Sequence, residues 1–211
     1  MLDLIIKNGF CYIDDDLKDK DIAIKDNKIV EIGKITSDAS EVVDASGLTV
    51  LPGCIDTQVH FREPGLTDAE DLHSGSRAAI AGGITSVFEM PNTNPPTSNK
   101  IEFRKKLDLA KNRMYCNYAF YFGATPDNES ELADLKDLEG CCGIKLFVGS
   151  STGNLLVQHE EDIEKVFKSS SKVVSVHSED EEILNMRKKL IKGGDVHSHP
   201  LWRNEECAIS S

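Results

Sequence analysis

The pattern of hydrophobic and polar positions changes near residue 51. Before that point, short apolar runs end at turn residues such as Asn8-Gly9 and Asp26-Asn27-Lys28. Apolar runs of this length, separated by Asn and Gly turns, are typical of strands and hairpins. The predicted strands cover residues 2–6, 21–25, 29–32 and 41–51. We therefore expect residues 1–51 to form a small β-subdomain.

From residue 52 onwards, apolar segments alternate with amphipathic ones. The apolar segments predict strands over residues 54–61, 85–90, 115–122, 142–148 and 172–177. The amphipathic segments predict helices over about residues 70–81, 99–112, 129–138 and 157–168, and a further helix that carries Ile183, Met186 and Leu190. Strands that are apolar on both faces and are separated by helices predict a parallel sheet, and therefore an α/β fold.

Two architectures contain such a sheet, the open doubly wound sheet and the closed (β/α)8 barrel. No glycine-rich phosphate loop follows the first predicted strand, and polar residues gather at the carboxyl ends of the strands, which favours the barrel. A complete barrel needs eight strands and typically ~250 residues, whereas residues 52–211 provide five strands or so. We therefore expect a (β/α)8 TIM-type barrel that is C-terminally incomplete.

The charge balance excludes some functions. The chain has 24 Lys and Arg against 36 Asp and Glu, a net charge of -12, which argues against binding to nucleic acid or to an anionic membrane. No apolar run approaches the length of a membrane span, and the first residues do not resemble a signal peptide. The six cysteines match neither a zinc-finger spacing nor a disulfide framework. We expect a cytoplasmic protein with free thiols.

Three side chains at predicted strand ends suggest chemistry. His60 ends the first predicted barrel strand and shares a face with Gln58, Lys145 lies inside an apolar strand, and His177 ends the fifth. A buried lysine has a lowered pKa and becomes reactive, and neutral imidazole is a good metal ligand. Each residue also has a structural interpretation: His60 can be a hydrogen-bonded strand-end residue, Lys145 can pair with a carboxylate such as Asp56, and His177 can lie beside a helix cap.

Four segments carry a resemblance to a known family. Residues 52–65 resemble the opening metal motif of the dihydroorotases, and residues 89–95 (Glu-Met-Pro-Asn-Thr-Asn-Pro) resemble their second-strand signature. Residues 143–147 resemble the metal-bridging lysine segment of the amidohydrolase superfamily, and residues 176–179 its fifth-strand histidine segment. The resemblance extends over residues 2–211, although hydantoinases and allantoinases share the last two segments.

The resemblance implies a metal-dependent cyclic amide hydrolase that interconverts dihydroorotate and N-carbamoyl-L-aspartate in pyrimidine biosynthesis. It implies one or two zinc ions, with His60, Lys145 and His177 as ligands. Lys145, the implied catalytic residue, would be carbamylated so that it can bridge two metals. Arg62 and Asn92 would hold the substrate carboxylate, since the planar arginine fork matches a carboxylate.

The chain departs from the family pattern at Gln58, where the motif usually has a histidine. An amide oxygen is a weaker zinc ligand than imidazole, so the sequence leaves open one metal, two metals or none. It also leaves open a non-catalytic relative that is a structural partner of an aspartate carbamoyltransferase, or an enzyme for another cyclic amide such as allantoin or a hydantoin. We expect a homo-oligomer, and we expect a later metal histidine and a general-base aspartate to come from strands beyond this chain.

Overall fold

The computed structural model describes residues 1–151 and 153–211, and the chain divides into two compact units, Met1–Gly53 and Cys54–Ser211. The first unit contains only strands. They are β1 (Leu2–Lys7), β2 (Phe10–Ile13), β3 (Asp16–Asp19), β4 (Asp21–Lys25), β5 (Lys28–Gly33), β6 (Ala39–Asp44) and β7 (Thr49–Val50). They form a four-stranded sheet of order β5-β4-β1-β6 and a three-stranded sheet of order β3-β2-β7.

The predicted hairpin over residues 21–32 is present as the antiparallel pair β4–β5. A second hairpin, β2–β3, was not predicted. Its turn is formed by Asp14 and Asp15, which both adopt positive φ, a conformation that aspartate tolerates better than most residues. The small core of this unit contains Ile5, Ala23 and Ile35.

The second unit is built on one five-stranded sheet. Its strands are β8 (Cys54–Val59), β9 (Ile84–Glu89), β10 (Asn117–Gly123), β11 (Cys141–Phe147) and β12 (Val174–His177). Every neighbouring pair is parallel, and the order β12-β11-β10-β9-β8 follows the chain. Each strand therefore lies beside the next one in sequence, as in a barrel wall and unlike a doubly wound sheet. The α/β prediction is confirmed, with strand bounds that differ from the predicted ones by one or two residues.

Helices connect these strands. They are α1 (Leu72–Ala81), α2 (Lys100–Ala110), α3 (Glu129–Ala133) and α4 (Glu160–Ser169), followed after β12 by α5 (Glu181–Arg187), α6 (His199–Trp202) and α7 (Glu205–Ile209), with short 3-10 turns at Gly153–Leu155, Lys188–Leu190 and Val196–Ser198. Asn99 caps α2 by accepting from the Glu102 amide at 2.9 Å. The helix predicted over residues 129–138 is shorter, and α4 begins three residues later than the predicted 157.

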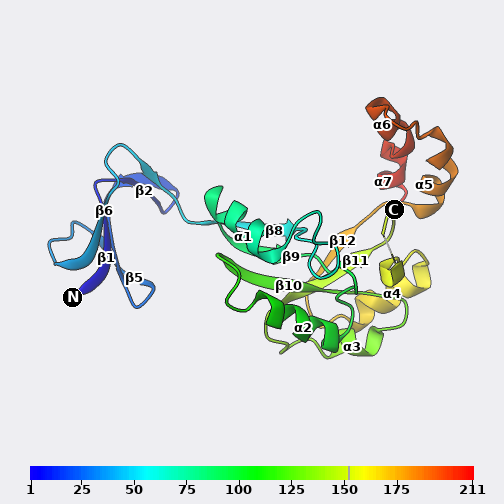
Figure 1. The fold of residues 1–211 in the computed structure, drawn as a ribbon, viewed down its shortest axis with the longest axis horizontal. Helices are drawn as coiled ribbons and strands as arrows, with labels where there is room; N and C mark the ends of the chain where they lie inside the picture. The colour runs from blue at the N-terminus through cyan, green and yellow to red at the C-terminus, as the bar shows by residue number, and fades with distance from the viewer. Residues whose placement is uncertain (152) are drawn as a thin grey trace. The chain divides into compact units, whose positions relative to one another are not determined.

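The two faces of the sheet differ in character. Helices α2, α3 and α4 lie along one face (Figure 1), and the buried core between them includes Phe120, Ile144 and Leu146 from the strands. Side chains alternate along a strand, so Lys145, between Ile144 and Leu146, points to the opposite face. The chemistry-bearing residues therefore need to be sought on that opposite face and at the carboxyl ends of the strands.

Within the described residues, none of the helices combines the length and the apolar character needed to cross a membrane.

Candidate functional site

His60 follows β8 directly and is half-buried. Its Nδ1 lies 2.9 Å from Oδ1 of Asn92, on the loop after β9. Because Oδ1 can only accept, Nδ1 carries the ring proton and Nε2 keeps a free electron pair. Burial lowers the pKa of His60, and the positive charges of Arg62 and Lys145 lower it further. His60 is therefore held neutral, the form in which imidazole binds a metal.

The loops that carry Arg62 and Asn92 are joined to each other. The Asn94 amide donates to the Pro64 carbonyl at 3.0 Å. Gly65 has a φ of +83°, and a Cβ there would lie 2.0 Å from the Asn94 carbonyl oxygen. Only glycine permits this approach, so the motif fixes the two loops side by side.

Glu63 anchors the first loop to the helices. Its carboxylate accepts from Arg113 Nη1 at 2.8 Å and Nη2 at 3.2 Å, and from the Leu72 amide at the start of α1 at 3.0 Å. No carboxylate of the described residues lies within 4.0 Å of the Arg62 guanidinium. In this loop Glu63 forms a salt bridge, and Arg62 does not. The Arg62 charge is thus not neutralised by an ion pair.

Lys145 is 2% exposed, and its Nζ lies 5.0 Å from the centroid of the Phe147 ring. The alternative ion pair with Asp56 is not formed: Asp56 accepts from the Gln58 amide, and no carboxylate of the described residues pairs with Lys145. Burial therefore lowers the pKa of Lys145 without an opposing charge. A lowered pKa increases the fraction of neutral amine, which is the nucleophilic form.

His177 ends β12 and pairs in register with Phe147 on β11, two residues after Lys145. Its Nε2 lies 2.5 Å from Oε2 of Glu179. Glu179 also forms an ion pair with Arg203, which lies between α6 and α7, and the hydrogen bond from Arg203 lowers the Glu179 pKa. His177 thus lies on the same face as Lys145, with Nε2 engaged by a carboxylate.

Gln58 comes from an irregular part of β8. Val59 pairs in register with Glu89 and packs against the helix-facing core, so His60, the next residue, points to the opposite side of the sheet. The register of β8 against β9 shifts between Asp56 and Val59, so strand alternation does not assign a face to the exposed Gln58. The structure therefore brings His60, Lys145 and His177 to one face of one sheet.

The donors fit a metal ion in part. His60 offers a free Nε2, and Lys145 is buried without a counter-charge, as expected of a lysine that becomes anionic on modification. His177 would need to release Glu179 to use Nε2. Among the described residues no three His, Cys, Asp or Glu side chains gather closely enough to hold a metal, so the donors present here do not by themselves complete a four-coordinate zinc site.

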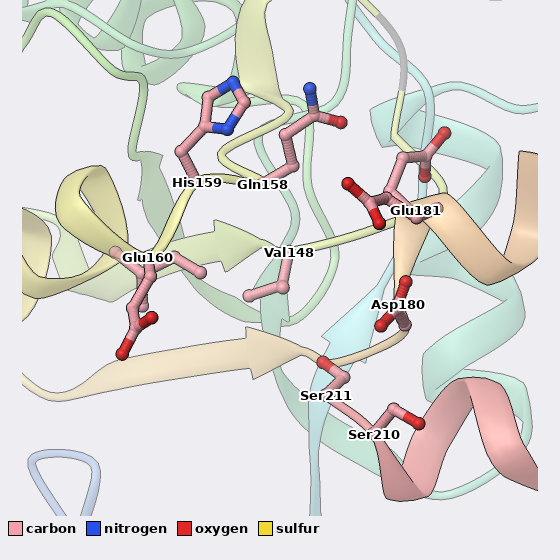
Figure 2. A pocket seen from close by; sticks show the side chains of 10 residues that line it. Val148, Gln158, His159, Glu160, Asp180, Glu181, Ser210 and Ser211 are labelled. Carbon is pink, nitrogen blue, oxygen red and sulfur yellow. The ribbon is translucent and has the colours of Figure 1, made fainter.

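A pocket of about 530 Å³ lies near this face but has a different lining. Figure 2 shows Gln158 and His159 before α4, across from Asp180 and Glu181 at the start of α5. Neither His60, Lys145 nor His177 lines it. Its acidic side chains oppose an anionic ligand, so we do not assign the predicted substrate to this pocket.

Three ion pairs around the site were missed by the sequence reasoning: Glu63–Arg113, Glu89–Lys106 and Glu179–Arg203. A signal existed for one of them. Lys106 shares a helix face with Phe103 and Ala110, at spacings of three and four, and Glu89 ends an apolar strand. Opposite charges inside two apolar patterns indicate a buried pair.

Comparison with known proteins places these features in a family. A dihydroorotase of Methanosarcina mazei is 38% identical over 206 residues, which cover 94% of this chain and 45% of that protein. An allantoinase of Escherichia coli is 41% identical over 149 residues, 70% of this chain and 33% of its own. The structure of an L-hydantoinase (dihydropyrimidinase) from Arthrobacter aurescens superposes with a TM-score of 0.90 at 29% identity, covering 100% of this chain and 49% of that one.

The chain thus spans about half the length of the relatives it matches. The resemblance to dihydroorotases and the amidohydrolase-type fold predicted from the sequence are confirmed. The amidohydrolase family model matches residues 49–205, which include every candidate site residue. This chain therefore belongs to the amidohydrolase family.

Proposed function

We propose that this chain carries part of the active site of a dihydroorotase-type cyclic amide hydrolase, which converts dihydroorotate and water to N-carbamoyl-L-aspartate. The observation that carries the proposal is the Arg62 guanidinium beside His60, whose positive charge lowers the His60 pKa. No carboxylate among the described residues pairs with Arg62. In a chain with a net charge of -12, an unpaired guanidinium suits an anionic substrate.

In this proposal, Arg62 and Asn92 hold the substrate carboxylate. The guanidinium offers two parallel N–H donors that match a carboxylate. Asn92 uses Oδ1 to accept from His60, which leaves its Nδ2 donors for the ligand. One amide would thus orient a metal ligand and the substrate together.

His60, Lys145 and His177 are the proposed ligands of zinc, which when bound lowers the pKa of water and polarises the scissile carbonyl. The neutral Lys145 amine would add to CO₂, forming an N–C bond and releasing one proton. The resulting carbamate supplies the anion that buried Lys145 lacks. Asn92 holds the proton on His60 Nδ1, which leaves the Nε2 electron pair available to a metal.

Two other functions have specific support. The E. coli allantoinase is 41% identical over 70% of this chain, and the dihydroorotase is 38% identical over 94% of it. Another cyclic amide such as allantoin is therefore a second candidate substrate. Gln58 instead favours a non-catalytic structural partner of an aspartate carbamoyltransferase, because the amide weakens the metal site.

The test is dihydroorotate ring opening by the full-length protein with zinc supplied. Loss of dihydroorotate absorbance that Lys145→Ala or His177→Ala abolishes supports the proposal. A folded protein that is inactive until Gln58→His is introduced supports the structural partner. Turnover of allantoin without turnover of dihydroorotate supports the second substrate.

A further inference from the structure

Behind the candidate site, Glu89 and Lys106 form a buried ion pair. Their side chains are 1% and 0% exposed. Glu89 ends β9 and Lys106 lies on α2, so the pair occupies the core between the sheet and its helix, on the face opposite to Lys145. The proposed chemistry does not use either residue.

The contacts of this pair reach both strand ends that carry the site. Lys106 Nζ binds the Glu89 carboxylate and donates to the Met90 carbonyl at 2.9 Å, two residues before Asn92. Glu89 pairs in register with Val59, the residue before His60, and the Met90 amide donates to the Val59 carbonyl at 3.0 Å. The pair therefore joins the ends of β8 and β9 from behind.

Stability alone does not call for two buried charges here. Taking both groups out of water opposes their charged forms: burial raises the pKa of Glu89 to about 7 and lowers that of Lys106. Buried ion pairs can often be replaced by apolar side chains of similar volume without loss of stability. Apolar side chains, however, could not hold the Met90 carbonyl in place as Lys106 does.

We propose that Glu89 and Lys106 are positioning residues that set the His60–Asn92 contact, and through it the metal affinity of His60 and the placement of Asn92 against the substrate. The substrate in this proposal is that of the proposed function, whereas the contacts of Glu89 and Lys106 come from the structure. Partners of a metal-binding histidine typically change metal affinity or activity by about 10–100-fold.

The test compares thermal stability, zinc affinity and kcat/KM for dihydroorotate in the full-length protein. We expect Glu89→Met/Lys106→Met to unfold within a few degrees of the parent protein, because no buried charge is left alone. We expect its zinc affinity and kcat/KM to fall about 10–100-fold. Lys105→Met, on the same helix but in an exposed pair with Glu102, should change none of the three.

If the double variant fails to fold, a second variant still tests the proposal. Glu89→Gln keeps the shape of Glu89 and an acceptor oxygen for Lys106, so it should retain more zinc affinity than Glu89→Met. Parent-like zinc affinity and kcat/KM in the stable double variant, or equal zinc affinities in Glu89→Gln and Glu89→Met, would overturn the proposal. An inactive parent protein would count against the dihydroorotase function alone, because zinc affinity still reports on the pair.

Discussion

The Nδ1 atom of His60 and the Oδ1 atom of Asn92 lie 2.9 Å apart, across the ends of two neighbouring parallel strands. This contact gives Asn92 two separate tasks in the proposed function. Its oxygen fixes the proton of a metal-binding imidazole, and its nitrogen is left to donate to the substrate. Because the tasks use different atoms, substitutions at Asn92 can separate them.

Asn92→Asp keeps an acceptor for His60 but places a negative charge where the substrate carboxylate should bind. We expect zinc affinity to be kept and KM for dihydroorotate to rise at least about 10-fold, since a hydrogen bond to a charged group contributes roughly 1.5–3 kcal/mol. Asn92→Ala should lower zinc affinity as well, by about 10–100-fold. Zinc competition and steady-state kinetics measure the two effects. Equal zinc affinity in both variants would show that Asn92 does not orient His60.

Arg62→Met tests the substrate class. The variant loses the guanidinium but keeps an apolar chain of similar length. The kcat/KM for dihydroorotate should therefore fall about 10–100-fold, the loss that corresponds to removing a hydrogen bond to a charged group. Turnover of allantoin, tested in parallel, should change little because that substrate lacks the carboxylate. Arg104→Met, at an exposed position of α2, is the matched control. Equal losses for both substrates would mean that Arg62 supports the loop rather than the carboxylate.

Gly65→Ala tests whether the two motif loops depend on their close approach. An added Cβ would lie 2.0 Å from the Asn94 carbonyl oxygen at a φ of +83°. Gly83→Ala is the control, since Gly83 has a φ of +84° with nothing within 4 Å. Denaturant unfolding should show about 1–2 kcal/mol lost in Gly83→Ala, the cost of positive φ, and clearly more in Gly65→Ala. Equal losses would show that the loops move apart at little cost.

Much of the second unit could be predicted because largely apolar strand segments, such as β10 and β11, alternate with helices that have one apolar face, such as α4. The strand order agrees with the predicted barrel, because in a barrel wall each strand lies beside the next one in sequence. The boundaries were less accurate where caps decide them: α2 begins after the Asn99 cap, and α4 after His159, which makes no side-chain cap bond. The Asp14-Asp15 turn was missed because it contains neither glycine nor asparagine.

The candidate site was predictable as a set of residues but not as a set of contacts. Lys145 stood out as a charge inside an apolar strand, and its burial without a carboxylate partner agrees with that signal. The bond between His60 and Asn92 joins residues 32 apart in sequence, and that between Glu63 and Arg113 joins residues 50 apart. Pairings of this kind depend on the register of neighbouring strands and on helix placement, which periodicity does not determine.

Gln58→His addresses the departure from the family pattern. Gln58 is two residues from His60, so an imidazole there would add a nitrogen donor close to His60 in sequence. Because zinc prefers imidazole to an amide oxygen, we expect zinc affinity, or the number of zinc ions bound per chain, to increase. Metal analysis after dialysis measures both, and Gln158→His, on the separate acidic pocket, controls for adventitious binding.

The activity of Gln58→His then distinguishes two explanations for the glutamine at position 58. If the parent protein already opens dihydroorotate and the variant gains little, the amide oxygen serves in a working site that depends mainly on Lys145 and His177. If activity appears only with the histidine, residue 58 is where the catalytic site was lost, and Arg62 and Asn92 remain from an ancestral substrate pocket. Unchanged zinc binding in the variant would contradict the proposal that residues 58 and 60 bind one metal, since two imidazoles should bind zinc more tightly than one.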